Sequence, residues 1–240
     1  MTAQRLRIGY VGVAYTTYYA DEHNQFGRAI DGLQLLADEL DFDLVAIDHG
    51  IPDLESAREV AAHLKGENLD FLLLQTAAVA SGELLEPLTE IAPRLGIWGT
   101  PEPAASGPIQ LHSLVAVNHY ASIIRRYLSD RDIPYKWFFG HIEDPDFDRR
   151  LRVTLRALKG MKAMSTARIG WIGGNSPGFF NMQFNEDSLS ERFGTTIGTH
   201  EISEIVERAR SVSDRDRSVV VRSAREMAVA SANPAFQRAL

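Results

Sequence analysis

The spacing of hydrophobic positions changes repeatedly along the chain. Segments rich in apolar residues predict strands at 6–14, 43–47, 70–75, 95–98 and 135–139, and the run at 70–75 is typical of a parallel strand that is buried on both faces. Between them, apolar residues recur every three or four positions and predict amphipathic helices at about 26–40, 53–64, 82–91, 112–130 and 147–164. Strands alternating with helices are typical of a doubly wound α/β domain with a parallel sheet and right-handed crossovers.

A turn at Asp144-Pro145-Asp146 is the best candidate domain boundary, and it divides the chain into residues 1–143 and 144–240. The second part repeats the alternation. Strands are predicted at 168–172 and 195–200, a glycine-rich loop at 173–178, and helices at 187–193 and from 203 onward. We therefore expect two doubly wound, Rossmann-like parallel-sheet domains. The second is expected to continue into a catalytic domain outside residues 1–240.

Polar and aromatic side chains follow three of the predicted strands, namely Tyr15, Thr16, Gln75, Thr76, Trp98 and Thr100. The carboxyl ends of parallel strands meet at one edge of a sheet, which is where open α/β sheets bind ligands. Amides, hydroxyls and aromatic faces suit a neutral polyol such as a sugar. Each residue taken singly is also consistent with a structural role, and Trp98 in particular with a place in the core.

The segment from Gly170 to Gly178 invites comparison with a dinucleotide-binding loop, but its glycine spacing does not fit G-x-G-x-x-G. This disfavours a nucleotide-binding oxidoreductase. Asn175 and Ser176 could donate hydrogen bonds to a ligand, and Asn175 is kept as a candidate substrate-binding residue. A turn that needs glycine for its backbone conformation explains the segment equally well.

Composition removes several classes of function. The net charge of −7 argues against nucleic acid or an anionic membrane as partner, and the lack of cysteine excludes disulfides and thiolate chemistry. No apolar run is long enough to span a bilayer and the amino terminus lacks a signal-peptide core, so we expect a cytoplasmic protein. The seven histidines show no metal-ligand spacing and no G-x-S-x-G elbow occurs. We therefore assign no catalytic residue and no metal ligand within residues 1–240.

Several short segments, taken in order, resemble the L-fucose isomerase family and, more distantly, the L-arabinose isomerases. They are Ile97-Trp98-Gly99-Thr100 with Glu102 and Pro103, Phe139-Gly140-His141, Lys159-Gly160-Met161-Lys162 leading into Arg168-Ile169-Gly170, and Phe193-Gly194. The resemblance covers the chain from about Asp70 to Arg210.

This resemblance implies a three-domain aldose–ketose isomerase with two Rossmann-like domains first. The third domain carries a divalent metal, usually Mn²⁺, and would lie outside residues 1–240. The metal binds adjacent oxygens of a monosaccharide while carboxylates move a proton through an ene-diol. The resemblance also implies a homo-oligomer, a trimer or hexamer, with active sites between subunits. Residues 1–240 alone are then expected to be inactive. The alternative from another class is a non-catalytic two-domain module that binds or senses a sugar.

Overall fold

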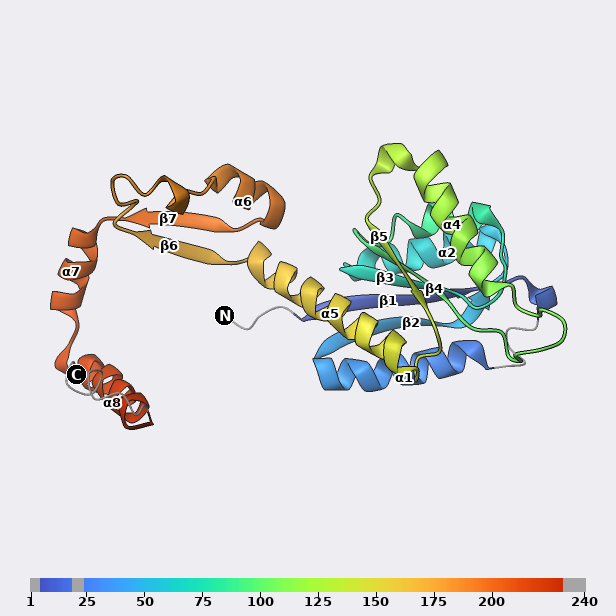
Figure 1. Ribbon diagram of the computed structural model, residues 1–240, viewed down its shortest axis with the longest axis horizontal. Helices are drawn as coiled ribbons and strands as arrows, with labels where there is room; N and C mark the ends of the chain where they lie inside the picture. The colour runs from blue at the N-terminus through green and yellow to red at the C-terminus, as the bar shows by residue number, and fades with distance from the viewer. Residues whose placement is uncertain (1–4, 19–23, 231–240) are drawn as a thin grey trace. The chain divides into compact units, whose positions relative to one another are not determined.

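The computed structural model describes residues 5–18 and 24–230 (Figure 1). The chain divides into two compact units, Met1–Ala163 and Met164–Leu240. Each unit is described by itself below.

The first unit is built on a five-stranded sheet. Its strands are β1 (Leu6–Val13), β2 (Phe42–Ile51), β3 (Phe71–Thr76), β4 (Leu95–Gly99) and β5 (Tyr135–Phe139). All neighbouring strands are parallel and their order is β2-β1-β3-β4-β5. This order is that of flavodoxin-like doubly wound sheets, and the winding reverses between β1 and β3. The expected α/β fold with a Rossmann-like parallel sheet is confirmed.

Helices cover both faces of this sheet, and their apolar sides form two cores. One face carries α1 (Gln25–Leu40) and α5 (Pro145–Ser165), and the other carries α2 (Leu54–Leu64), α3 (Leu85–Leu88) and α4 (Ser113–Tyr127) (Figure 1). Four short 3₁₀ turns complete the unit: η1 (Thr16–Tyr18), η2 (Lys65–Glu67), η3 (Gly82–Leu84) and η4 (Ser129–Arg131). Side chains of β3 alternate between the two cores, because Leu73 lies with the α1 and α5 helices and Leu74 with α2, α3 and α4.

The second strand is longer than its apolar run predicts. We expected it to end before Asp48-His49-Gly50, but β2 continues to Ile51. Its register with β1 shifts, since Tyr10 pairs with Ala46 whereas Gly12 pairs with Gly50. Such a bulge on an edge strand lets exposed polar residues remain within a strand.

The helix after β5 belongs to the first unit, which places the division of the chain later than the 143/144 boundary that we expected. The apolar residues of α5 are buried in the core that also contains Trp98, and they are Phe147, Leu151, Leu155 and Leu158. The turn at 144–146 therefore begins the helix that covers the sheet. The division falls between Ala163 and Met164.

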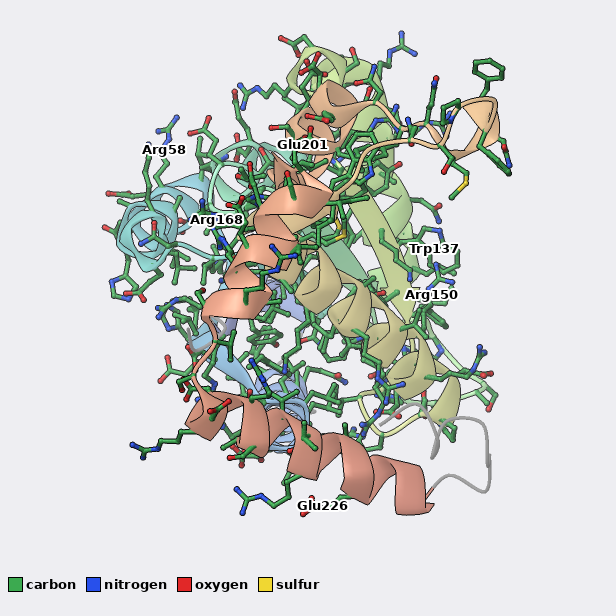
Figure 2. All side chains as sticks on the ribbon, turned by 90° about the vertical axis from the view of Figure 1, so that its left-hand side faces the viewer. Arg58, Trp137, Arg150, Arg168, Glu201 and Glu226 are labelled. Atoms are coloured by element: carbon green, nitrogen blue, oxygen red, sulfur yellow. The ribbon has the colours of Figure 1, made fainter. Side chains whose placement is uncertain are left out.

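The free edge of the sheet at β5 is covered in part by an arginine of α5. Trp137 on β5 is half-exposed, and Arg150 Nε donates a hydrogen bond of 3.2 Å to its carbonyl oxygen. The guanidinium also lies over the Trp137 ring, 5.2 Å from its centroid, and Figure 2 shows the two side chains together.

The second unit contains two parallel strands, β6 (Arg168–Ile172) and β7 (Thr196–His200). Between them lie η5 (Phe180–Met182) and α6 (Glu186–Phe193), and after them come α7 (Ile202–Ser211) and α8 (Asp214–Ala230). The described residues of this unit thus form one parallel βαβ repeat and two further helices. Among its described side chains, Thr195 alone is fully buried.

None of the helices in residues 5–18 and 24–230 is both long and apolar enough to cross a membrane.

Candidate functional site

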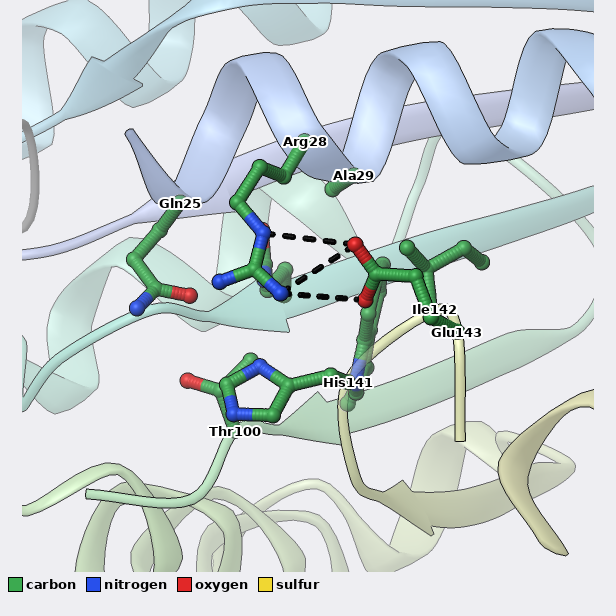
Figure 3. Close-up of a pocket in the computed structure, with 9 residues that line it drawn as sticks. Gln25, Arg28, Ala29, Thr100, His141, Ile142 and Glu143 are labelled. Atoms are coloured by element: carbon green, nitrogen blue, oxygen red, sulfur yellow. Dashed lines mark hydrogen bonds and ion pairs between the residues drawn. The ribbon is translucent and has the colours of Figure 1, made fainter. Parts of the chain in front are cut away.

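A small pocket opens at the carboxyl edge of the first sheet. Its walls come from the first turns of α1, the ends of β3 and β4, and the turn between β5 and α5 (Figure 3). The residues that line it are Gln25, Arg28, Ala29, Gln75, Trp98, Thr100, His141, Ile142 and Glu143. Its inner volume of about 10 Å³ is enough for about one water molecule. A monosaccharide could therefore contact only the mouth of the pocket.

The floor of the pocket is made by Gln75 and Trp98, which are direct neighbours in the pairing of β3 with β4. Both are 1% exposed. The Tyr10 hydroxyl donates to Gln75 Oε1, and Trp98 Nε1 donates to the Gly140 carbonyl oxygen at 2.8 Å. Burial raises the pKa of Tyr10 far above its ordinary value, so its hydroxyl stays protonated and remains a donor. Gln75 Oε1 and Trp98 Nε1 are therefore held by hydrogen bonds within the protein, which fixes the position of the floor.

The mouth of the pocket carries an ion pair between Arg28 of α1 and Glu143 of the turn after β5. Arg28 Nη2 lies 3.1 Å from both carboxylate oxygens, and Nε lies 3.3 Å from Oε1. Both side chains are accessible, with 43% and 57% of their surfaces exposed. Partial burial acts to raise the pKa of Glu143, but hydrogen bonds from its own backbone amide and from Arg28 outweigh this and lower it. The carboxylate is thus ionised at neutral pH.

A buried set of hydroxyl groups ties β3, β4 and α4 together beside the pocket. The Thr76 hydroxyl donates a hydrogen bond of 3.2 Å to the Trp98 carbonyl oxygen, and the Ser113 hydroxyl donates one to the Thr76 carbonyl oxygen. Ser113 Oγ in turn accepts a hydrogen bond of 2.7 Å from the Thr100 amide. These bonds fix the position at which the chain leaves β4, and so the position of the Thr100 side chain on the pocket wall.

The loop between β4 and α4 is closed by Glu102. Its carboxylate accepts hydrogen bonds of 2.8 Å from the backbone amides of Gln110, Leu111 and His112. Burial acts to raise the pKa of Glu102, but these three amides outweigh it, and the pKa lies below the ordinary value. The segment between Glu102 and Gln110 is therefore held as a loop at the same edge of the sheet.

The structure brings together three of the predicted site residues, because Gln75, Trp98 and Thr100 line one pocket. Thr76 is their neighbour, but its side chain faces α4. Tyr15 and Thr16 follow β1 at the same carboxyl edge and are exposed outside the pocket.

The remaining predicted residue, Asn175, lies in the second unit, in the loop after β6, and is half-buried.

The residues at the mouth of the pocket were missed by the sequence analysis. His141 and Glu143 directly follow the fifth strand, so the rule applied to the other strand ends would have found them. Arg28 lies on a helix among other polar residues and carries no signal in the sequence. Only the packing of α1 beside the turn after β5 brings its guanidinium to this edge.

Within the described ranges, 5–18 and 24–230, no group of three or more histidine, aspartate or glutamate side chains is arranged to hold a metal ion. The residues of the pocket do not form a metal site either, since Glu143 is paired with Arg28.

No protein-family model matches the chain. The chain is similar to proteins named sulfoquinovose isomerase from three bacteria. In those of Priestia megaterium and Priestia aryabhattai, 162 residues match at 25% identity, covering 67% of this chain and 35% of the relative. In that of Alkalicoccus urumqiensis, 146 residues match at 25% identity, covering 60% of this chain and 32% of the relative. The matched part thus spans about a third of these relatives. The similarity points to a sugar isomerase, and not specifically to the L-fucose isomerase family.

Proposed function

We propose that this chain is the sugar-binding part of an aldose–ketose isomerase that acts on a free monosaccharide. The observation that carries the proposal is the polar pocket at the carboxyl edge of a doubly wound sheet, where such sheets bind ligands. The similarity to sulfoquinovose isomerases supports the same class of reaction. Sulfoquinovose is a glucose that bears a sulfonate on C6, so the proposed substrates are hexoses and their sulfonated forms.

In this proposal the chain binds the sugar and does not move its protons. The sugar lies over the mouth of the pocket, where exposed polar groups bind its hydroxyls, and the buried floor made by Gln75 and Trp98 keeps the mouth in place. Tyr15 and Thr16 extend this surface along the same edge. Because the pocket is too small to enclose a monosaccharide, a second wall is needed, and we propose that another subunit of a homo-oligomer supplies it.

We place the divalent metal of the reaction, Mn²⁺ in this proposal, outside residues 1–240. The described residues offer no ligand group for it. When bound, such a metal would stabilise the charge that develops on the sugar oxygens during the proton transfer. The contribution of this chain is to fix the position of the sugar.

The test compares residues 1–240 with the protein encoded by the complete reading frame. Each is incubated with Mn²⁺ and with glucose, other aldoses or sulfoquinovose, and aldose–ketose interconversion is followed by NMR. We expect turnover by the product of the complete reading frame and none by residues 1–240. Turnover by residues 1–240 would refute the assignment of the catalytic groups to another part. Lack of turnover by both, with sugar binding retained, would favour the non-catalytic sugar-binding module.

A further inference from the structure

The ion pair at the mouth of the pocket leaves one side of the Arg28 guanidinium available. A guanidinium has five N–H donors, arranged along two edges that can each bind two oxygens. Glu143 occupies the edge formed by Nε and Nη2. No hydrogen bond from Nη1 is found within the part of the chain that the structure describes. The edge formed by Nη1 and Nη2 is thus open to a ligand.

The contacts with Glu143 set the direction in which this open edge of Arg28 points. Figure 3 shows the guanidinium turned so that its open edge faces away from Glu143, toward the side of the mouth where Thr100 and the His141 ring lie. Glu143 fixes the plane of the guanidinium through three contacts, so less conformational freedom is lost when a ligand binds.

The amino-terminal end of α1 lies at the same pocket. Gln25, at the first position of α1, lines the pocket together with Arg28. The first amides of a helix point outward and carry a positive partial charge. The amino-terminal end of α1 therefore adds a positive partial charge at the pocket that Arg28 lines, which favours an anion over a neutral hydroxyl.

We propose that Arg28, held by Glu143, is the residue that recognises an oxyanion on the sugar, a sulfonate or a carboxylate at the exocyclic carbon. The inference deepens the proposed function and rests on it. The two oxygens of the anion bind the Nη1–Nη2 edge, and the sugar ring lies over the mouth of the pocket. A neutral hexose has no such group and makes one uncharged hydrogen bond at most to this edge.

The test measures binding to the 240-residue chain by calorimetry, with glucose, glucuronate and sulfoquinovose as ligands. We expect at least one of the two anionic sugars to bind at least about tenfold more tightly than glucose, the size expected of a charge-assisted hydrogen bond. Arg28→Gln should abolish this difference, and it should lower the affinity for the anionic sugar by a much larger factor than the affinity for glucose. Glu143→Gln should preserve the difference, because it removes a competing negative charge and keeps the open edge.

Arg58→Gln is the matched control. Arg58 is an exposed arginine on α2, which covers the opposite face of the sheet, and Figure 2 shows it at the surface. This variant loses the same charge and should bind all three sugars as the parent chain does. The inference would be overturned if the three sugars bound with equal affinity or if neither anionic sugar bound. It would also be overturned if the preference survived in Arg28→Gln or if the control variant lost it too.

The outcomes separate this inference from the proposed function. An Arg28-dependent preference for an anionic sugar, with no isomerisation by the product of the complete reading frame, would refute the function and support the inference. Isomerisation by that product together with equal binding of neutral and anionic sugars would do the reverse. A preference shown by sulfoquinovose alone would identify the sulfonate, and one shared by glucuronate would identify oxyanions in general.

Discussion

Replacing Trp98 with phenylalanine should destabilise the first unit strongly, although an aromatic ring is retained. Trp98 is 1% exposed, and its ring lies 4.6 Å from that of Phe147. The variant loses the 2.8 Å hydrogen bond to the Gly140 carbonyl, which is buried beside the pocket. An unsatisfied buried acceptor costs about 1–3 kcal/mol, and the lost ring volume adds roughly 1 kcal/mol. We therefore expect a loss of about 2–4 kcal/mol in the free energy of unfolding.

The measurement is urea unfolding followed by far-ultraviolet circular dichroism, with thermal unfolding as a second probe. For a chain of this size the loss corresponds to a fall in Tm of roughly 5–15 °C. Trp137→Phe is the control, because it makes the same exchange at a half-exposed position on the neighbouring strand. Among the described residues, no hydrogen bond of the Trp137 ring nitrogen is found. It should cost less than about 1 kcal/mol. If the two variants are equally stable, the hydrogen bond and the packing of Trp98 do not contribute as we infer.

Three further predictions concern Glu102 and Gly140, which lie near the pocket, and Asp70, which lies at the opposite edge of the sheet. Glu102→Gln should weaken the pH dependence of stability. The lowered pKa of Glu102 stabilises the fold above the ordinary glutamate pKa of about 4.3, and this stabilisation is lost as the pH falls through the pKa of the folded state. The difference in Tm between pH 6 and pH 3 should therefore be smaller in the variant than in the parent chain. Asp70→Asn should cost about 1–3 kcal/mol in urea unfolding, because Asp70 accepts a 2.6 Å bond from Lys162 in a half-buried ion pair; an unchanged midpoint would contradict this. Gly140→Ala should cost about 1–3 kcal/mol, since φ is +133° there and a Cβ would lie 3.0 Å from the Asp144 carboxylate; a variant as stable as the parent in the same assay would show that this backbone relaxes freely.

The sheet could be predicted from the sequence because burial on both faces leaves a strong pattern. β3 is fully buried along its length, and four consecutive apolar residues, Phe71 to Leu74, make up most of it. The end of β2 could not be predicted in this way, because an edge strand tolerates Asp48 and His49 through a bulge. The domain boundary was placed too early because a turn before a helix looks the same whether the helix covers the preceding sheet or begins a new one.

In the candidate site too, the residues at strand ends could be predicted from the sequence, and the contacts that depend on packing between distant segments could not. Gln75, Trp98 and Thr100 meet as expected, since strand order brings consecutive carboxyl ends together. The pairing of Arg28 with Glu143 joins positions 115 residues apart, and no local pattern encodes it. The exposure of the predicted residues also depends on packing, which buries Trp98 and leaves Tyr15 at the surface.

The contact of Arg150 with β5 bears on how this sheet can meet other chains. The terminal strand of a sheet exposes backbone groups that can pair with a strand of another molecule, which leads to unwanted assembly. Arg150 already donates a hydrogen bond to the outward-facing carbonyl oxygen of Trp137 and places a positive charge beside it. A foreign strand would have to displace that guanidinium to continue the ladder, and in doing so would leave a charged group without its acceptor. Sheet extension is therefore disfavoured at this edge, and contacts there are expected to use side chains, with the aromatic ring of Trp137 as the accessible surface.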